Sequence, residues 1–156
     1  MNTSLAEVGL AVRRLRWRHH RTASTRLATI GLSLAQWDVL RHLHEQPEAS
    51  LHALAELTFQ TDQSMGALAT RMVERRLLER LAGPGRAVRH RATDAGERAR
   101  VAGTEIMRGV LAETVGTLPE NELSTLHRLL LKAAAGREAT AGRESTAGRE
   151  SVAGPV

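Results

Sequence analysis

Apolar residues recur at intervals of three or four along most of the chain, which is the spacing of an α-helix. Over the first helical stretch these positions are Leu5, Val8, Val12, Leu15 and His19. They predict a long helix over residues 5–28, ended by Gly31. Ser33 followed by Gln36 has the spacing of a capping box, so a second helix is expected to begin at Leu34.

Three shorter helices follow in close succession. The first runs from Leu34 to about Gln46, and the second from Leu51 to about Leu57. The third covers residues 61–77 within the stretch from Phe59 to Arg80. Pro47 ends the first of them, and Ser50 caps the second. Short helices that meet through a tight turn predict a helix-turn-helix.

The hydrophobic pattern changes after Arg80. Leu81-Ala82 and Ala87–Arg91 are short extended candidates on either side of the turn signal Gly83-Pro84-Gly85. A hairpin directly after a helix-turn-helix predicts a wing. Two further helices are expected beyond it, from Asp94 to about Val115 and from Pro119 onward. Their apolar positions are Ala95, Ala99, Ala102, Ile106, Val110 and Ala112 in the first, and Leu123, Leu126, Leu130 and Ala133 in the second.

The helix expected after Phe59 has two different faces. Its apolar face carries Met65, Leu68, Ala69 and Met72. Its other face carries Gln63, Ser64, Ala67, Thr70 and Arg71, and Thr61 caps its first turn. Glutamine can read adenine, arginine can read guanine, and hydroxyl groups can reach phosphate or base edges. This face is therefore suited to a DNA major groove, although an ordinary amphipathic surface helix would show the same periodicity.

The basic residues of the chain are concentrated around this helix. The formal net charge is +5, and residues 71–100 alone hold nine Arg against four acidic residues. A second run, Arg13 to Arg26, holds six Arg and no acidic residue. Such zones suggest a polyanion partner, or simply a solvated basic surface on an Arg-rich protein. The chain contains no Cys, no membrane-spanning run and no secretory leader, so a cytoplasmic location is expected.

Several motifs resemble the MarR family of bacterial transcription regulators over residues 5–134. The segment GLSLAQWDVLRHLHEQPEASLHALAELTFQ is similar to the family's second and third helices, and LLER is similar to the end of its recognition helix. Arg86 followed by Thr93-Asp94-Ala95-Gly96 is similar to the wing arginine and the motif that closes the wing. The chain departs from the family at Arg76, where Gly is usual, at Ala92, where Leu is usual, and in a shorter wing with Gly-Pro-Gly in place of Asp.

The resemblance implies a homodimer that binds double-stranded DNA at a palindromic operator, most commonly as a repressor relieved by a ligand. It assigns base contacts to Gln63, Ser64, Ala67 and Arg71. It places Thr61, Thr70 and Arg75 near the DNA backbone and makes Arg86 the wing contact, with Arg89 beside it in the basic run. A single winged unit makes few contacts, and two-fold pairing doubles them.

The expected fold class is mainly α with a small β-wing: a winged helix-turn-helix plus long terminal dimerisation helices. Residues 1–31 would form the N-terminal dimerisation helix, 32–93 the DNA-binding domain and 94–134 the C-terminal dimerisation helices. From Ala135 the chain repeats with a period of six, AGREAT, AGREST and AGRESV. This low-complexity segment, 135–156, has no apolar face to bury and is expected to be a disordered tail.

A small aromatic or anionic effector is a second expected partner. In the family such ligands often bind between the dimer helices and the winged unit, where Trp17, His20, Trp37 and Arg41 are the candidates. Both Trp residues are equally explained as core or interface residues. The His pairs His19-His20 and His42/His44 point apart on a helix, so no metal site and no cofactor is expected.

No motif joins a nucleophile to a base, no glycine loop cradles a phosphate, and an enzyme is not expected. The sequence therefore predicts a ligand-responsive, sequence-specific regulator. Two alternatives stay open. One is a small-molecule or metal sensor with weak or lost DNA binding, and the other is a non-specific architectural DNA binder.

Overall fold

The computed structural model describes residues 3–81 and 88–135, in two compact units, Met1–Thr114 and Val115–Val156. The described part of the first unit contains α1 (Leu5–Ala28), α2 (Leu34–Glu45), α3 (Leu51–Leu57), α4 (Asp62–Glu74), β1 (Leu78–Leu81), β2 (Arg89–Ala92) and α5 (Asp94–Glu113). The second contains a 3₁₀ turn, η1 (Val115–Thr117), and α6 (Glu120–Ala135). The predicted fold class, mainly helical with a small β-wing, is confirmed. None of the described helices is long and apolar enough to cross a membrane.

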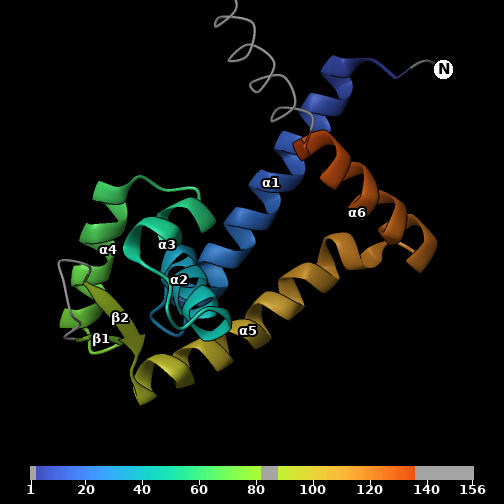
Figure 1. Ribbon diagram of the computed structural model, residues 1–156. Coiled ribbons are helices and arrows are strands. Elements are labelled where there is room, and N and C mark those ends of the chain that lie inside the picture. Colours follow the sequence, from blue (N-terminus) through green and yellow to red (C-terminus); the bar gives the residue numbers. More distant parts are fainter. Residues whose placement is uncertain (1–2, 82–87, 136–156) are drawn as a thin grey trace, which may run out of the picture. The chain divides into compact units, whose positions relative to one another are not determined.

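Polar side chains fix where the helices of the first unit begin. Ser33 and Gln36 form the predicted capping box of α2, and Ser4 with Glu7 forms a second one at the start of α1. The caps of α3, α4 and α5 are single side chains, Ser50, Thr61 and Thr93, each of which accepts a backbone N–H three residues on. In Figure 1, helices α2, α3 and α4 gather with the wing in one group, and α1 extends away from it.

Helices α1, α3 and α4 end in the same way. In each, a residue in the left-handed conformation follows the helix: Gly31 (φ 72°), Phe59 (φ 55°) and Arg76 (φ 57°). After α4, Arg76 N–H donates to the carbonyl oxygen of Val73 at 2.9 Å and Leu77 N–H donates to that of Met72 at 2.9 Å. These paired bonds define a Schellman motif, which is usually completed by glycine.

The expectation of a helix over residues 61–77, within the stretch from Phe59 to Arg80, was therefore wrong at its C-terminal end. Helix α4 stops at Glu74, and the next strand begins at Leu78. Leu77 and Leu78 are buried, which turns the chain out of the helix and into the wing although its local sequence favours a helix.

The wing is an antiparallel pair in which Leu78 faces Ala92 and Arg80 faces His90. Its strands do not match the predicted extended runs: the first starts three residues before Leu81, and the second ends one residue after Arg91. The predicted turn at Gly83-Pro84-Gly85 and the wing contact Arg86 lie outside the described residues.

The core of the first unit lies where α1, α2, α3, α4, the wing and α5 meet. It contains Leu27, Leu40, Leu54, Met65, Met72, Leu78 and Val110 among its fully enclosed side chains. The predicted apolar face of α5 was partly wrong, because Ala102 and Ala112 are exposed. Gly96 and Gly103 are buried in their place, against the carbonyl oxygen of Leu77 and the indole of Trp37. These contacts need the absence of a side chain, which apolar periodicity does not reveal.

Candidate nucleic-acid interface

Helices α3 and α4 form the predicted helix-turn-helix. The turn between them contains Phe59, whose side chain is 97% exposed. His52, near the start of α3, contacts Asp62, the first residue of α4, with Nδ1 and Oδ1 2.9 Å apart. The hydrogen bond to Asp62 raises the pKa of His52. This contact ties the start of α4 to α3, and it was not foreseen because the two residues carry no shared sequence motif.

Helix α4 divides into the two faces that the sequence predicts. Met65, Leu68, Ala69 and Met72 are buried. The opposite face is exposed and carries Gln63, Ser64, Ala67, Thr70 and Arg71. The helix therefore packs through one side and presents the other, with Thr61 at its exposed N-terminal end.

The polar groups of the exposed face are not equally available. The Thr61 hydroxyl donates to Ser64 Oγ at 3.0 Å, and the Thr70 hydroxyl donates to the carbonyl oxygen of Gly66 at 3.0 Å. Within the described part of the chain, the side chains of Gln63 and Arg71 form no hydrogen bond or ion pair. The donors and acceptors of these two side chains therefore remain free within the described residues.

Much of the basic run is already engaged with the protein itself. Arg75 donates through Nη1 to Gln36 Oε1 at 3.0 Å and through Nη2 to the carbonyl oxygen of Gly31 at 2.7 Å. The ion pairs of this region are Arg89–Glu48, Arg91–Glu79 and Arg100–Glu97. Arg75 and Arg89 are therefore bound intramolecularly, a constraint that the sequence did not reveal.

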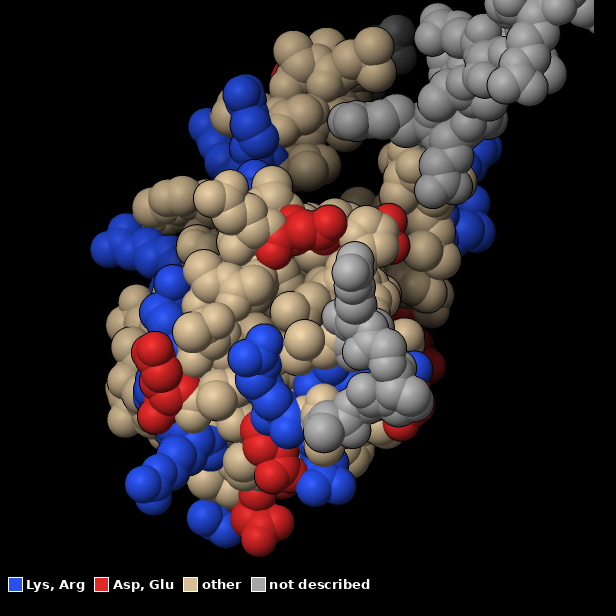
Figure 2. Space-filling view, turned by 60° about the vertical axis from the view of Figure 1, so that its left-hand side comes forward, with Lys and Arg blue, Asp and Glu red and all other residues tan. Residues whose placement is uncertain are grey.

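On the face that Figure 2 shows, the basic side chains do not form one continuous patch. Among the described residues, Arg71, Arg76, Arg80 and Arg98 form neither an ion pair nor a side-chain hydrogen bond. In the lower half of Figure 2, basic side chains stand in separate groups with acidic side chains between them.

The inner side of the wing contains a buried histidine. His90 is 4% exposed, and its Nδ1 has no hydrogen-bond partner among the described residues. Burial lowers the pKa of His90, and the nearby Arg80 guanidinium lowers it further. His90 therefore packs beneath the wing as a neutral ring.

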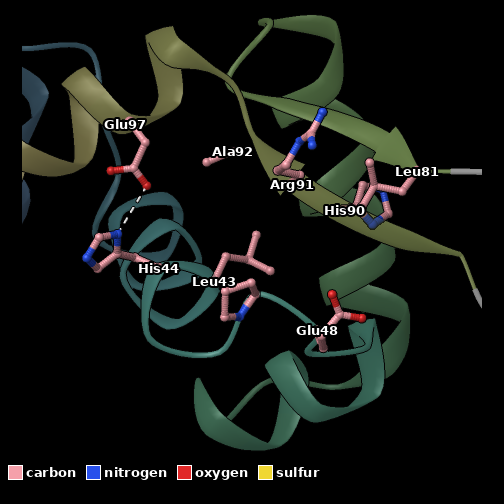
Figure 3. Close-up of a pocket in the computed structure, with 9 residues that line it drawn as sticks. Leu43, His44, Glu48, Leu81, His90, Arg91, Ala92 and Glu97 are labelled. Atoms are coloured by element: carbon pink, nitrogen blue, oxygen red, sulfur yellow. Dashed lines mark ion pairs between the residues drawn. The ribbon is translucent and has the colours of Figure 1, made fainter.

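A hollow of about 370 Å³ lies on one side of His90 (Figure 3). It is open to solvent and is lined by the end of α2, the loop after it, the wing strands and the start of α5. Leu43, Leu81 and Ala92 form apolar parts of its wall. At one end lie His44 and Glu97, whose Nδ1 and Oε1 atoms are 3.4 Å apart. This volume is near the lower limit of small-molecule pockets.

The four predicted effector residues fall into two separate pairs. Trp37 is 8% exposed, its Nε1 donates to Thr104 Oγ1 at 3.4 Å, and the Arg41 guanidinium lies 5.6 Å from its ring centroid. Trp17 is 62% exposed and lines a hollow of about 420 Å³ on α1 with His20, Arg13 and Arg16. Trp37 and Arg41 do not line that hollow.

Metal ligands do not gather in this part of the molecule. No group of three or more His, Asp or Glu side chains that could hold a metal ion occurs within residues 3–81 and 88–135.

A helix-turn-helix followed by a two-stranded wing defines the chain as a winged helix-turn-helix protein. Residues 30–87 match the family model described as the MarR family, and this match, with the similar structures below, confirms the predicted resemblance to that family. No curated protein matches the sequence.

Solved structures of similar fold cover most of the chain. A mutant MarR from E. coli, complexed with operator DNA, is 19% identical with a TM-score of 0.74, over 84% of this chain and 99% of that one. BpsR of Bordetella bronchiseptica, whose DNA binding is regulated by 6-hydroxynicotinic acid, is 25% identical with a TM-score of 0.74, over 82% and 98%. A Mycobacterium tuberculosis MarR family protein in complex with salicylic acid is 22% identical with a TM-score of 0.66, over 85% and 97%.

Proposed function

We propose that this chain is a sequence-specific DNA-binding transcription regulator and not an enzyme. The observation that carries the proposal is the exposed face of α4, where Gln63 and Arg71 are free while the opposite face is anchored in the core. Gln63 and Arg71 read base edges in the major groove, Ser64 and Ala67 lie against the same bases, and Thr61 and Thr70 approach the backbone. Arg86 supplies the wing contact, and Arg89 joins it by leaving its ion pair with Glu48.

The regulator acts as a homodimer on a palindromic operator. Support comes from apolar side chains that remain exposed on α1, among them Leu5 (93%), Val8 (50%) and Val12 (50%). Helix α6 also presents apolar residues, with Leu129 49% and Leu131 58% exposed. Monomers rarely leave such stripes in water, and a second copy would cover them. In this proposal residues 1–31 and 94–134 form the dimer, and residues 32–93 bind DNA.

A small aromatic acid releases the regulator from DNA and relieves repression. The hollow on α1 supports this step, because Arg13 and Arg16 offer cationic groups beside the indole of Trp17 and the imidazole of His20. Relatives of this fold bind salicylic acid or respond to 6-hydroxynicotinic acid. Trp37 and Arg41 do not line this hollow and are left out of the proposed effector site.

Selection of bound duplexes from a random DNA pool tests the proposal, followed by affinity measurements over a range of salt concentrations. A recovered palindrome with half-sites about one helical turn apart supports a dimeric regulator. Salt-dependent binding without an enriched sequence would favour the architectural alternative, and absent binding in the dimeric protein would favour a sensor that has lost its DNA role.

The proposed contact between Arg71 and a base edge is tested by comparing two variants. Arg71→Ala is expected to weaken operator binding by about tenfold to a hundredfold and to relax the preference at one base pair of each half-site. Arg108→Ala is the control, because Arg108 is exposed on α5 and paired with Glu105 at 2.7 Å. An Arg71→Ala variant with unchanged sequence preference would contradict the assignment.

A further inference from the structure

The C-terminal end of the candidate recognition helix is fastened to a distant corner of the fold. Arg75, the C-cap residue of α4, donates from Nη1 to Gln36 and from Nη2 to Gly31, which lie 39 and 44 residues earlier in the chain. Both acceptors belong to the corner where α1 ends and α2 begins. The Arg75 side chain therefore joins the end of α4 to the corner between α1 and α2.

The two acceptor groups at this corner are also fixed by hydrogen bonds that do not involve Arg75. Gln36 is 8% exposed, and its Oε1 also accepts the Ser33 N–H at 3.0 Å as part of the α2 capping box. Gly31 has φ 72°, and its N–H donates to the carbonyl oxygen of Ala28 at 3.0 Å, which fixes the end of α1. A guanidinium fork matches two fixed acceptors, whereas a lysine ammonium offers only a point charge.

We propose that Arg75 is a positioning residue that sets the orientation of α4 against the α1–α2 corner, and so the spacing of the two recognition helices in the dimer. This inference rests on the proposed function. It assigns Arg75 to the protein framework rather than to the DNA backbone. The opposite end of α4 is held independently by the His52–Asp62 contact. Loss of the Arg75 fork frees one end of the helix while the other end stays fixed.

The two roles of Arg75 differ in their dependence on salt. A phosphate contact releases counterions, so its removal lowers the slope of log K against log salt by about one. A positioning residue that never meets phosphate leaves that slope unchanged while affinity falls. Arg75→Lys separates these effects further, because it keeps the charge and removes the fork.

The experiment measures operator affinity, salt slope and tolerance to half-site spacing for Arg75→Ala, Arg75→Lys, Gln36→Ala and the double variant Arg75→Lys/Gln36→Ala. Each single variant is expected to weaken operator binding about tenfold with an unchanged slope and a broader spacing preference. The double variant should bind the operator about as well as the single variant of lower affinity, because both changes remove the same hydrogen bond between Arg75 and Gln36. Gln36→Glu should retain binding, since a carboxylate still accepts from Arg75 and from Ser33 N–H.

Two controls exclude simpler explanations. Arg76→Lys alters the neighbouring exposed arginine, which makes no ion pair among the described residues, and should leave spacing preference unchanged. Ser33→Ala weakens the α2 cap but leaves Gln36 and Arg75 together, so it should preserve the spacing preference as well.

The outcome that overturns the inference is a slope lowered by about one in Arg75→Ala, with Gln36→Ala equal to the unaltered protein. Hydrogen exchange without DNA separates this failure from failure of the proposed function. Arg75→Lys should accelerate exchange at the N–H groups of Arg76 and Leu77 even if no duplex is bound. Unchanged exchange there would also overturn it.

Discussion

The indole ring of Trp37 lies against Gly103. A Cβ atom at Gly103 would lie 3.1 Å from Trp37 Nε1 and closer still to Cδ1, so no larger residue fits without displacing the ring. The contact lets α2 and α5 approach closely, and Nε1 donates to Thr104 in the next position of α5. Trp37 therefore connects the winged helix-turn-helix to the long helix that follows it.

Gly103→Ala is expected to destabilise the fold by about 1–3 kcal/mol, because the added methyl group overpacks a filled contact. Helix propensity alone would give the opposite sign, since alanine is favoured over glycine in a helix interior. Gly109→Ala in the same helix is the matched control: its Cβ would meet only Arg26 Nη1, at 3.6 Å. Urea unfolding of both variants measures the difference, and equal stabilisation by both would contradict the Trp37–Gly103 contact.

Arg76→Gly is expected to stabilise the protein by about 1 kcal/mol, because glycine adopts φ 57° without the steric cost of a Cβ. Arg76→Ala is the control, since it removes the charge and keeps the cost. Thermal unfolding should show a higher midpoint for the glycine variant than for either the arginine or the alanine form. A midpoint raised equally by alanine would assign the effect to charge repulsion among the arginines.

The beginning of each helix was predictable and some of the ends were not. Beginnings depend on local side chains, such as Ser33 with Gln36, whose spacing can be recognised in the sequence. The end of α4 depends on burial of Leu77 and Leu78 against distant elements. That burial forces Arg76, a good helix former, into a conformation that its own sequence disfavours.

The candidate site was predictable to a similar degree. Periodicity separated the buried and exposed faces of α4, because the 3.6-residue repeat depends on local geometry alone. It could not show that Arg75 and Arg89 are bound within the protein, since their partners Gln36, Gly31 and Glu48 lie far away in sequence. Contacts between residues far apart in the chain leave no periodic pattern in its sequence.

Stability is expected to fall as the pH drops below about 6.5, in part because of His90. Burial lowers its pKa in the folded chain, so the unfolded chain takes up the proton first and unfolding is favoured on acidification. The loss begins below the pKa of the unfolded chain and is complete below that of the folded chain. His42 contributes with the same sign, because burial also lowers its pKa.

His90→Leu is expected to raise stability at pH 7 by about 1 kcal/mol, since it removes the unpartnered Nδ1, and to reduce the acid-side loss. Urea unfolding at about pH 5.5 and pH 7.5 measures both effects. An acid-side loss in His90→Leu equal to that of the unaltered protein would contradict the assignment of that loss to His90.

His52→Gln should change the pH dependence of stability in the opposite direction. The pKa of His52 is raised by Asp62, so the stabilisation from this contact is complete at low pH and is lost as the pH rises through the folded pKa.

The exposed leucines of α6 provide a test of the dimer. Leu123, Leu126 and Leu130 recur at helical spacing, and none of the residues of α6 is buried. Leu130→Asp places a carboxylate on this face, and in a dimer its desolvation is expected to raise the dissociation constant by about a hundredfold or more.

Asn121→Asp introduces the same carboxylate on the other side of α6, about 170° around the helix from the centre of the leucine face, and serves as the matched control. Sedimentation equilibrium should show monomers for Leu130→Asp at concentrations where the Asn121→Asp variant remains dimeric. Operator binding should fall with dimerisation, because each subunit then brings only one recognition helix to a two-fold site. Dimers that survive Leu130→Asp unchanged would assign the pairing to the exposed apolar stripe of α1 alone, and full operator binding by a monomer would contradict the two-fold mode.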